Sequence, residues 1–186
     1  MVDKIQAEFS ETFLIVWDTA KGSELYRQGY YGKPLGIPKP KSMEFNVPLI
    51  LDLMEGLYLA EKEMLTVCEG VKKKTKVNLE KLRQRARKLY GEFDLKYAVY
   101  RDFRDHGLIV TPGIKFGCDF AVYKRGPGIE HAPYMVSVKK ATDEVTATEL
   151  VKAGRLATTV RKRFIVAVPE AETEKIRYLI FKWFKA

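Results

Sequence analysis

The chain has 186 residues, 46% of them hydrophobic and 31% charged, and it carries a formal net charge of +9. This length fits one ordinary domain or two small ones, with enough apolar residues to build a core. No apolar run approaches the ~20 residues that a membrane span needs, and residues 1–4 lack the pattern of a secretory signal. We therefore expect a soluble cytoplasmic protein that does not associate with membranes. The positive charge favours a polyanionic partner such as a nucleic acid, although a generic basic surface would account for it about as well.

The two cysteines, Cys68 and Cys118, lie far apart in the sequence and show no metal-ligand spacing. We interpret them as two buried thiols. A disulfide between them stays open as an alternative, because intracellular disulfides occur in proteins of hyperthermophiles.

The first half begins with strand-like residues that end at residues 13–17, a run of β-branched and aromatic side chains. Residues 29–48 are rich in proline and glycine, which predicts a loop. The lysines in this loop are Lys33, Lys39 and Lys41. The apolar stretch that follows, at residues 49–62, predicts a helix.

A further helix is predicted at residues 79–90, where Asn78 is a suitable N-cap and apolar residues recur at helical spacing. Its other face is strongly basic, which we interpret first as a solvated surface and second as an RNA contact. Gly91 ends this helix, and we place a domain boundary there. Asp94 is expected to cap another helix that runs to Asp105.

The second half alternates strands and helices more regularly. Residues 108–110 predict a short strand, and the alternation of apolar and polar residues over 114–122 predicts a longer one with Tyr123 on its more polar face. A loop is expected at residues 124–133. The remaining predicted elements are a strand at 134–138, a helix from the Thr146–Glu149 capping box to about Arg161, a central buried strand at 164–168 and a final apolar strand at 176–184.

This order of elements predicts an α/β (α+β) fold made of two small domains. The first is an N-terminal α/β domain, residues 1–91. The second is a C-terminal domain, residues 92–186, in which helices pack against a mixed sheet.

Candidate catalytic residues are few, because the chain has only two histidines. His106 lies at the end of a predicted helix, where the helix dipole favours an imidazolium, so a structural role is the better interpretation. His131 lies in a loop between two predicted strands and is either a plain surface residue or a functional one.

Several enzyme classes are argued against by what the sequence lacks. It has no His/Cys cluster for zinc, no phosphate-binding P-loop and no Gly-x-Ser-x-Gly motif. Asp119 is a candidate carboxylate for a metal-dependent nuclease, but the next strand offers Val138-Lys139-Lys140 in place of a second carboxylate followed by lysine. The chemistry left is proton transfer by a histidine with a basic neighbour.

Four segments of the second half form an ordered pattern: residues 100–107, 111–123, 130–136 and 154–163. The pattern resembles the catalytic domain of the tRNA intron endonuclease family, over roughly residues 95–182. Residues 45–65, which contain Gly56-Leu57-Tyr58-Leu59-Ala60-Glu61, resemble the N-terminal domain of that family more weakly.

The resemblance implies a catalytic triad of Tyr123, His131 and Lys162. Tyr123 would take the proton of a ribose 2′-hydroxyl, His131 would protonate the leaving 5′-oxygen, and Lys162 would stabilise the charge on the phosphorane. An ordinary histidine, with a pKa near 6.5, suits a general acid. A tyrosine base, with an ordinary pKa near 10, needs cationic neighbours or a late proton transfer. The implied reaction uses no metal and no cofactor, and it leaves a 2′,3′-cyclic phosphate and a 5′-hydroxyl.

The resemblance also implies a substrate, namely precursor tRNA folded into a bulge-helix-bulge at the intron boundaries. Arg155, and less distinctively Arg177, match the pair of arginines that grips an unpaired intron base. Two alternatives remain open, a non-catalytic structural subunit and a basic RNA-binding module without activity.

The assembly that the resemblance implies is a tetramer. Residues 34–42 resemble the extra loop of crenarchaeal-type catalytic subunits, and the lysines at 33, 39 and 41 are expected to reach RNA phosphates, unless the loop is only a tolerated surface insertion. The acidic turn at residues 170–174 matches a loop that docks into a neighbouring subunit. We therefore expect a heterotetramer with a paralogous structural subunit, in which the strand around residues 179–184 is buried between subunits.

Overall fold

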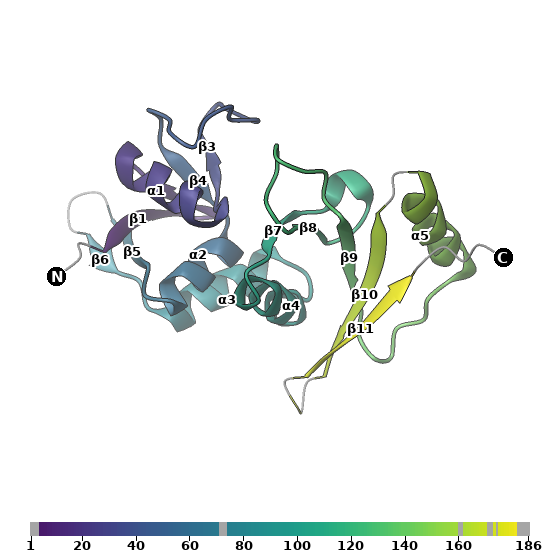
Figure 1. Cartoon of the computed structure of the whole chain (residues 1–186). Coiled ribbons are helices and arrows are strands. Elements are labelled where there is room, and N and C mark those ends of the chain that lie inside the picture. Colours follow the sequence, from purple (N-terminus) through teal and green to yellow (C-terminus); the bar gives the residue numbers. More distant parts are fainter. Residues whose placement is uncertain (1–3, 71–73, 160–161, 171–172, 174, 182–186) are drawn as a thin grey trace. The chain divides into compact units, whose positions relative to one another are not determined.

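The computed structural model describes residues 4–70, 74–159, 162–170, 173 and 175–181, without the side chains of Lys152 and residues 156–159. The chain forms two compact units, residues 1–93 and 94–186, here called the N-terminal unit and the C-terminal unit (Figure 1). Each unit contains one β-sheet with helices packed on it, which confirms the mixed α/β fold expected from the sequence.

The sheet of the N-terminal unit has the strand order β3-β4-β2-β1-β5-β6. β1 pairs in parallel with β5, and all other neighbours in this sheet are antiparallel. The strands are β1 (Ile5–Ser10), β2 (Phe13–Val16), β3 (Lys33–Pro34), β4 (Leu49–Leu51), β5 (Leu65–Glu69) and β6 (Thr75–Lys76). The helices of this unit are α1 (Thr19–Gly29), α2 (Leu53–Glu61) and α3 (Leu79–Leu89). The core is rich in leucine, and Leu14, Leu25 and Leu57 are fully buried.

The helix expected at residues 49–62 is wrong in its first turn. Residues 49–51 are β4, which pairs with β2, and α2 begins only after Asp52. The Asp52 side chain accepts from the backbone of Glu55 at 2.7 Å, and the Glu55 side chain accepts from the backbone of Asp52 at 3.1 Å. This capping box starts the helix at a defined residue.

Helix α1 was not among the elements predicted from the sequence. Its interior contains Gly22 and Ser23, which are weak helix formers. The glycine is required by packing, because a Cβ at Gly22 would lie only 3.0 Å from the Cβ of Leu49 on β4. The helix is capped by Asp18, whose side chain accepts from the backbone of Lys21 at 3.0 Å.

The proline- and glycine-rich loop is held at both ends. Leu35 donates to the carbonyl of Pro48 at 2.9 Å, and Ser23 exchanges hydrogen bonds with the backbone of Phe45. Gly32 has a φ of 73°, and a Cβ there would lie 2.5 Å from a backbone oxygen of β4. The loop is therefore anchored, while its lysines remain exposed.

The helix predicted at residues 79–90 is confirmed as α3, and Asn78 caps it by accepting from Lys81 at 2.8 Å. Most of its basic face is paired within the unit. The pairs are Lys81–Glu69, Arg83–Glu61 at 2.8 Å and Arg87–Glu80 at 3.9 Å. These contacts make this face of the helix an ion-paired, solvated surface.

The C-terminal unit contains a mixed sheet of order β11-β10-β9-β8-β7, in which β9 and β10 are parallel and the other neighbours antiparallel. Its strands are β7 (Ile109–Pro112), β8 (Phe120–Tyr123), β9 (Tyr134–Val138), β10 (Arg163–Pro169) and β11 (Ile176–Phe181). The helix α4 (Phe93–Asp105) leads into it, and α5 (Ala147–Thr159) lies alongside β10 and β11 (Figure 1). Asp94 was expected to be the N-cap of α4. It lies instead inside the first turn of that helix.

β10 is buried at its centre, as predicted, with Val166 and Ala167 almost fully inaccessible. The predicted strand over 114–122 is wrong in its first part. Residues 114–116 form a short 3-10 helix, η1 (Ile114–Phe116), and the strand begins only at Phe120. Gly117, with a φ of 68°, ends η1 in the left-handed conformation, which an extended strand does not contain.

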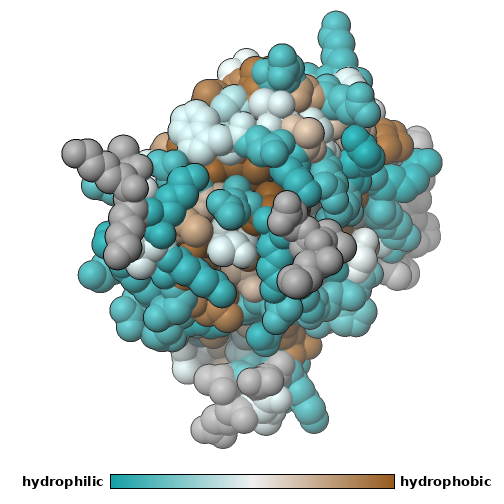
Figure 2. Space-filling view, turned by 90° about the vertical axis from the view of Figure 1, so that its left-hand side faces the viewer, coloured by the Kyte–Doolittle hydropathy of each residue, from teal (hydrophilic) through white to brown (hydrophobic). Residues whose placement is uncertain are grey.

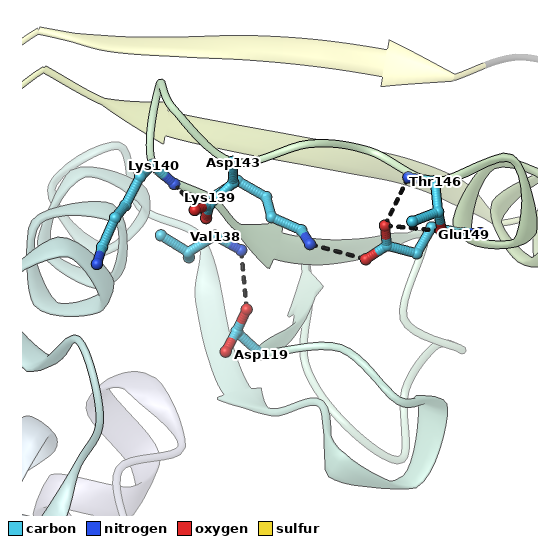
Figure 3. Close-up of polar contacts among 7 residues, drawn as sticks. All are labelled: Asp119, Val138, Lys139, Lys140, Asp143, Thr146 and Glu149. Carbon is cyan, nitrogen blue, oxygen red and sulfur yellow. Dashed lines mark hydrogen bonds and ion pairs between the residues drawn. The ribbon is translucent and has the colours of Figure 1, made fainter.

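The N-terminus of α5 confirms the predicted capping box (Figure 3). The backbone of Thr146 donates to the Glu149 carboxylate at 2.9 Å, and the backbone of Glu149 donates to the Thr146 hydroxyl at 3.2 Å. Glu149 also binds Lys139 on the segment after β9, at 2.7 Å. The predicted end of this helix at Arg161, most of the acidic turn at 170–174 and residues 182–184 lie outside the described residues.

Both cysteines are free thiols, and both are half-buried. None of the helices in the part of the chain that the structure describes is long and apolar enough to cross a bilayer. The face shown in Figure 2 carries mostly hydrophilic residues, with hydrophobic ones in small separate areas.

Candidate active site

Lys162 is the most unusual of the predicted site residues, because it is only 8% exposed. Lysine is rarely buried to this extent, since its ammonium group loses hydration. Its Nζ donates to the carbonyl of Ala132 at 3.0 Å and lies 4.5 Å from the centroid of the Phe116 ring. The position next to Ala132 follows from the parallel pairing of β9 and β10, in which Arg163 donates to the carbonyl of Pro133 at 2.8 Å.

Tyr123 and His131 lie near the same point of the fold. A small buried cluster consists of Ala121, Ala132 and Met135, and the half-buried Tyr123 packs against it. His131 directly precedes Ala132 and is exposed. The three predicted catalytic residues are thus joined through Ala132, which follows His131 in the chain, accepts from Lys162 and lies in the cluster that Tyr123 contacts.

The loop between Tyr123 and His131 is closed by the side chain of Glu130. Its carboxylate accepts from the backbone of Lys124 at 2.6 Å and from that of Arg125 at 2.5 Å. These hydrogen bonds, first that of Arg125, hold the pKa of Glu130 below its ordinary value. By binding these two backbone donors, the Glu130 carboxylate holds closed the loop that links Tyr123, the candidate base, to His131, the candidate acid.

The electrostatic surroundings of Lys162 are set mainly by burial. Burial lowers the pKa of Lys162, the neighbouring Lys115 lowers it further, and Cys118 acts in the opposite direction. Burial raises the pKa of the Cys118 thiol to about 11, so this thiol is neutral at physiological pH and packs as a small apolar side chain against the cluster of Ala121, Ala132 and Met135.

Asp119, the candidate for a metal-dependent nuclease, has a structural task. One carboxylate oxygen accepts from the backbone of Val138 at 2.8 Å, and the other pairs with Lys96 at 2.9 Å (Figure 3 shows the first contact). Lys139, which directly follows Val138, is paired with Glu149 at the start of α5. Among the described residues, no three His, Cys, Asp or Glu side chains lie close enough together to hold a metal ion.

The other histidine differs from His131. The Nδ1 of His106 lies 2.8 Å from the carbonyl of Asp102, one turn earlier in α4, and 3.6 Å from the Asp102 carboxylate. This contact at the helix C-terminus agrees with the structural role expected from the sequence. Within the described part of the chain, no residue hydrogen-bonds to the His131 imidazole.

The predicted RNA-binding residues are all exposed, but they lie on different elements. Arg155 lies on α5, and Arg177 lies on β11, where its Nε pairs with the Glu170 carboxylate. The loop lysines at 33, 39 and 41 belong to the N-terminal unit, and none of them forms an ion pair with another described residue.

Sequence reasoning did not single out Phe116 or Glu130. Glu130 carried a usable signal, because an acidic residue that ends a Gly-Pro-Gly loop can accept from the backbone donors at the start of the loop. Phe116 carried none, because its contact with Lys162 joins segments 46 residues apart in the sequence.

Comparison with known proteins identifies the family. The sequence profile of the tRNA intron endonuclease catalytic C-terminal domain matches residues 93–178, and that of the N-terminal domain matches residues 5–83. A protein of Hyperthermus butylicus named tRNA-splicing endonuclease is 48% identical over 171 residues, which are 92% of this chain and 93% of that protein. Proteins with the same name from Saccharolobus islandicus and Sulfurisphaera tokodaii are each 43% identical over 162 residues, which are 87% of this chain and 88% of theirs. The chain therefore belongs to the tRNA intron endonuclease family and is an endoribonuclease.

Proposed function

We propose that this chain is a tRNA-splicing endonuclease that cuts precursor tRNA at the bulge-helix-bulge formed around the intron boundaries. The family and the names of the relatives support tRNA splicing. A bulge offers unstacked bases next to helical RNA, and proteins read RNA most readily at such places.

The proposed reaction is a transesterification without a metal ion. The phenolate of Tyr123 takes the proton of the ribose 2′-hydroxyl, and the 2′-oxygen attacks the adjacent phosphorus. The bond from phosphorus to the 5′-oxygen breaks, and His131 gives its proton to that oxygen. Lys162 stabilises the negative charge that builds up on the phosphorane between these two events. The products are a 2′,3′-cyclic phosphate and a 5′-hydroxyl.

The observation that carries this proposal is the burial of Lys162 beside Ala132. Lys162 is 8% exposed, and burial lowers the pKa of its ammonium group. Keeping a charged group in such a place costs folding free energy, and groups of this kind cluster at functional sites. The ammonium of this lysine donates to the carbonyl of Ala132, the residue that directly follows His131.

For substrate binding, we propose that Arg155 and Arg177 stack on an unpaired intron base and that the loop lysines contact phosphates. The Arg177 side chain is 79% exposed, so it can exchange its surface ion pair with Glu170 for a base. The double variant Arg155→Ala, Arg177→Ala should bind precursor tRNA more weakly, by ~1–3 kcal/mol for each stacking contact. Unchanged cleavage at subsaturating RNA would contradict this assignment.

The proposed assembly is a heterotetramer with a paralogous structural subunit, which presents one active site to each bulge. β11 is an edge strand of its sheet, and Leu179 and Ile180 on it are 56% and 50% exposed. An edge strand with exposed apolar residues is suited to a subunit contact. Light scattering and cleavage assays on the purified chain test this, and an active homotetramer of this chain alone would contradict the heterotetramer.

The function is tested by a cleavage assay with a precursor tRNA that contains a bulge-helix-bulge, in excess chelator. The assay contains the full chain, first alone and then with the paralogous subunit. We expect cleavage at both intron boundaries and a cyclic phosphate that resists phosphatase until it is opened by acid. A reaction that stops in chelator and recovers with a divalent cation would overturn the metal-free mechanism. RNA binding without cleavage in either preparation would favour a non-catalytic subunit.

A further inference from the structure

The surroundings of the Lys162 ammonium contain one feature that the proposed reaction does not use. Among the described residues, its Nζ has one hydrogen-bond acceptor, the carbonyl of Ala132, and one aromatic ring, that of Phe116. An ammonium 4.5 Å from a ring centroid is within the range in which the negative face of the ring attracts a cation. The effect is greatest where water is excluded, as it is around this buried lysine.

The ring is held in place by its own segment. Phe116 ends η1, and its backbone donates to the carbonyl of Gly113 at 2.8 Å. Gly113 in turn donates to Asp119 at 2.8 Å, and a Cβ on Gly113 would lie 2.6 Å from the Sγ of Cys118. The side chain of Phe116 packs against the buried cluster of Ala121, Ala132 and Met135. The ring is therefore fixed from two directions, by the turn that carries it and by the cluster beneath it.

We propose that Phe116 is a positioning residue for Lys162, whose ring holds the ammonium in its charged form and against the carbonyl of Ala132. The proposal rests on the proposed function, because it assigns Phe116 a task only if the charge of Lys162 is used in the reaction. It accounts for how a lysine can be buried here with a single hydrogen bond to a described residue and still carry its charge.

The direction of the effect follows from the groups around the lysine. Burial lowers the pKa of Lys162, the positive charge of Lys115 lowers it further, and Cys118 raises it. His131 lies one residue before Ala132. Removing the ring removes an attraction that only the charged form feels, so the pKa of Lys162 should fall further. As the pH is raised, the variant therefore loses the charged, active form of Lys162 earlier than wild type does. The alkaline limb of the pH–rate profile is shifted to lower pH.

The experiment compares Phe116→Leu with Phe116→Trp and with the matched control Phe164→Leu. Phe164 is another half-buried phenylalanine packed against the same cluster, but no contact between its ring and the lysine exists in the described structure. Single-turnover cleavage is measured against pH, in the assembly that is active with wild-type chain. The RNA carries a bridging sulfur in place of the 5′-oxygen at the scissile bond, because a thiolate leaves without a general acid and the measured rate then no longer depends on His131.

We expect Phe116→Leu to be about 10-fold slower, with an alkaline limb about one pH unit lower, as expected for a single lost contact to a charged group. Phe116→Trp should restore both, because tryptophan is the best ring for a cation. Phe164→Leu should lower the melting temperature and leave the limb in place. Equal behaviour of Phe116→Leu and Phe164→Leu would overturn the proposal.

A second measurement separates this proposal from the proposed function. The pKa of Lys162 is followed by NMR in the free protein with isotope-labelled lysine Cε, and its signal is assigned from its loss in Lys162→Met. A lower pKa in Phe116→Leu supports the ring contact whether or not the chain cleaves RNA. An unchanged pKa refutes it even if cleavage proceeds as proposed, and failure of wild-type protein to cleave refutes the proposed function instead.

Discussion

Replacing Lys162 by methionine separates the catalytic role of the residue from its structural one. Methionine has a similar length and no charge, so it fills the same buried space. If the ammonium stabilises the phosphorane, the variant should lose cleavage while keeping its fold. If the lysine is only part of the core, stability and activity should change together.

The stability change is estimated from the contacts of the ammonium. The variant loses one hydrogen bond to Ala132, worth about 1 kcal/mol net, and the contact with the Phe116 ring, worth ~0.5–2 kcal/mol. It gains by removing a charge that burial disfavours, as the lowered pKa shows, and by adding apolar surface to the core. These changes oppose each other, so the free energy of unfolding should fall by less than the ~1.5–3 kcal/mol that the two lost contacts contribute together.

The activity change should be much larger. Removing one preorganised group that stabilises a developing negative charge typically costs ~10²–10³ in rate, or about 3–4 kcal/mol of transition-state stabilisation. Single-turnover cleavage at saturating RNA reports this step without the contribution of binding. Lys4→Met is the matched control, because Lys4 is exposed and has only a surface ion pair with Glu63 at 3.2 Å. A Lys162→Met variant that cleaves within fivefold of wild type, or whose loss only follows unfolding, refutes the assigned role.

Three further outcomes are expected. His131→Ala should slow cleavage ~10²–10⁴-fold while RNA binding is kept, and RNA with the bridging sulfur should restore most of the rate. The control His106→Ala should cleave normally, and an equal loss in both variants would contradict the general-acid role. Glu130→Gln should lower the single-turnover rate by about 10-fold or more at unchanged RNA affinity, because the loop that carries the acid loses its carboxylate clasp; weakened affinity with an unchanged rate would argue against it. The hydrogen bond from Lys139, together with those from Thr146, holds the pKa of Glu149 at about 2, below its ordinary 4.5. This carboxylate therefore stabilises the fold above pH 4.5 and loses that effect as pH falls toward 2. The difference in melting temperature between wild type and Glu149→Gln should vanish over the same range, and a constant difference would show that the pair does not contribute through its charge.

The elements that the sequence predicted well have their signals in neighbouring residues. The helix α5 begins at its capping box, with Thr146 and Glu149 three residues apart. β10 was predictable because a strand buried on both faces consists of continuous apolar residues. Both signals are independent of the rest of the fold, so a single sequence is enough to read them.

The errors came from patterns that continue across a local break. Residues 114–122 alternate like a strand, but Gly117 adopts the left-handed conformation and closes a 3-10 turn before the strand begins. Residues 49–62 are mostly apolar, and the side chain of Asp52, acting as a cap, separates a strand from a helix. In each case a single residue, through its backbone conformation at Gly117 and through its side-chain cap at Asp52, overrides the periodicity of its neighbours.

The candidate site was predictable as a set of residues but not as an arrangement. A resemblance in sequence can indicate Tyr123, His131 and Lys162 one by one. It cannot show that the parallel pairing of β9 and β10 brings Lys162 to the carbonyl of Ala132, because that contact joins residues 30 positions apart. Burial of the lysine is a consequence of this pairing, and it distinguishes Lys162 from the exposed Arg163 beside it in the sequence.

Three charged residues are buried in the described part of the chain, and the contacts of two of them differ from those of Lys162, the proposed catalytic one. Arg104 donates to the hydroxyl of Tyr100 at 3.1 Å and to a backbone carbonyl of β7 at 3.0 Å. Glu55 accepts from the backbone of Gly32 as well as closing the cap of α2. Both therefore offset the cost of burial with hydrogen bonds that hold the backbone together.

Lys162 offsets that cost less completely. Its ammonium has three donors, and one of them binds a described residue, the carbonyl of Ala132. The ring of Phe116 attracts the charge without using a donor. The ammonium donors that bind no described residue are suited to an anionic group. A phosphate in its five-coordinate state presents additional negative charge to them. A buried cation with this set of contacts is suboptimal for folding and suited to binding a transient anion, which is why we assign the electrostatic role to this lysine among the many basic residues of the chain.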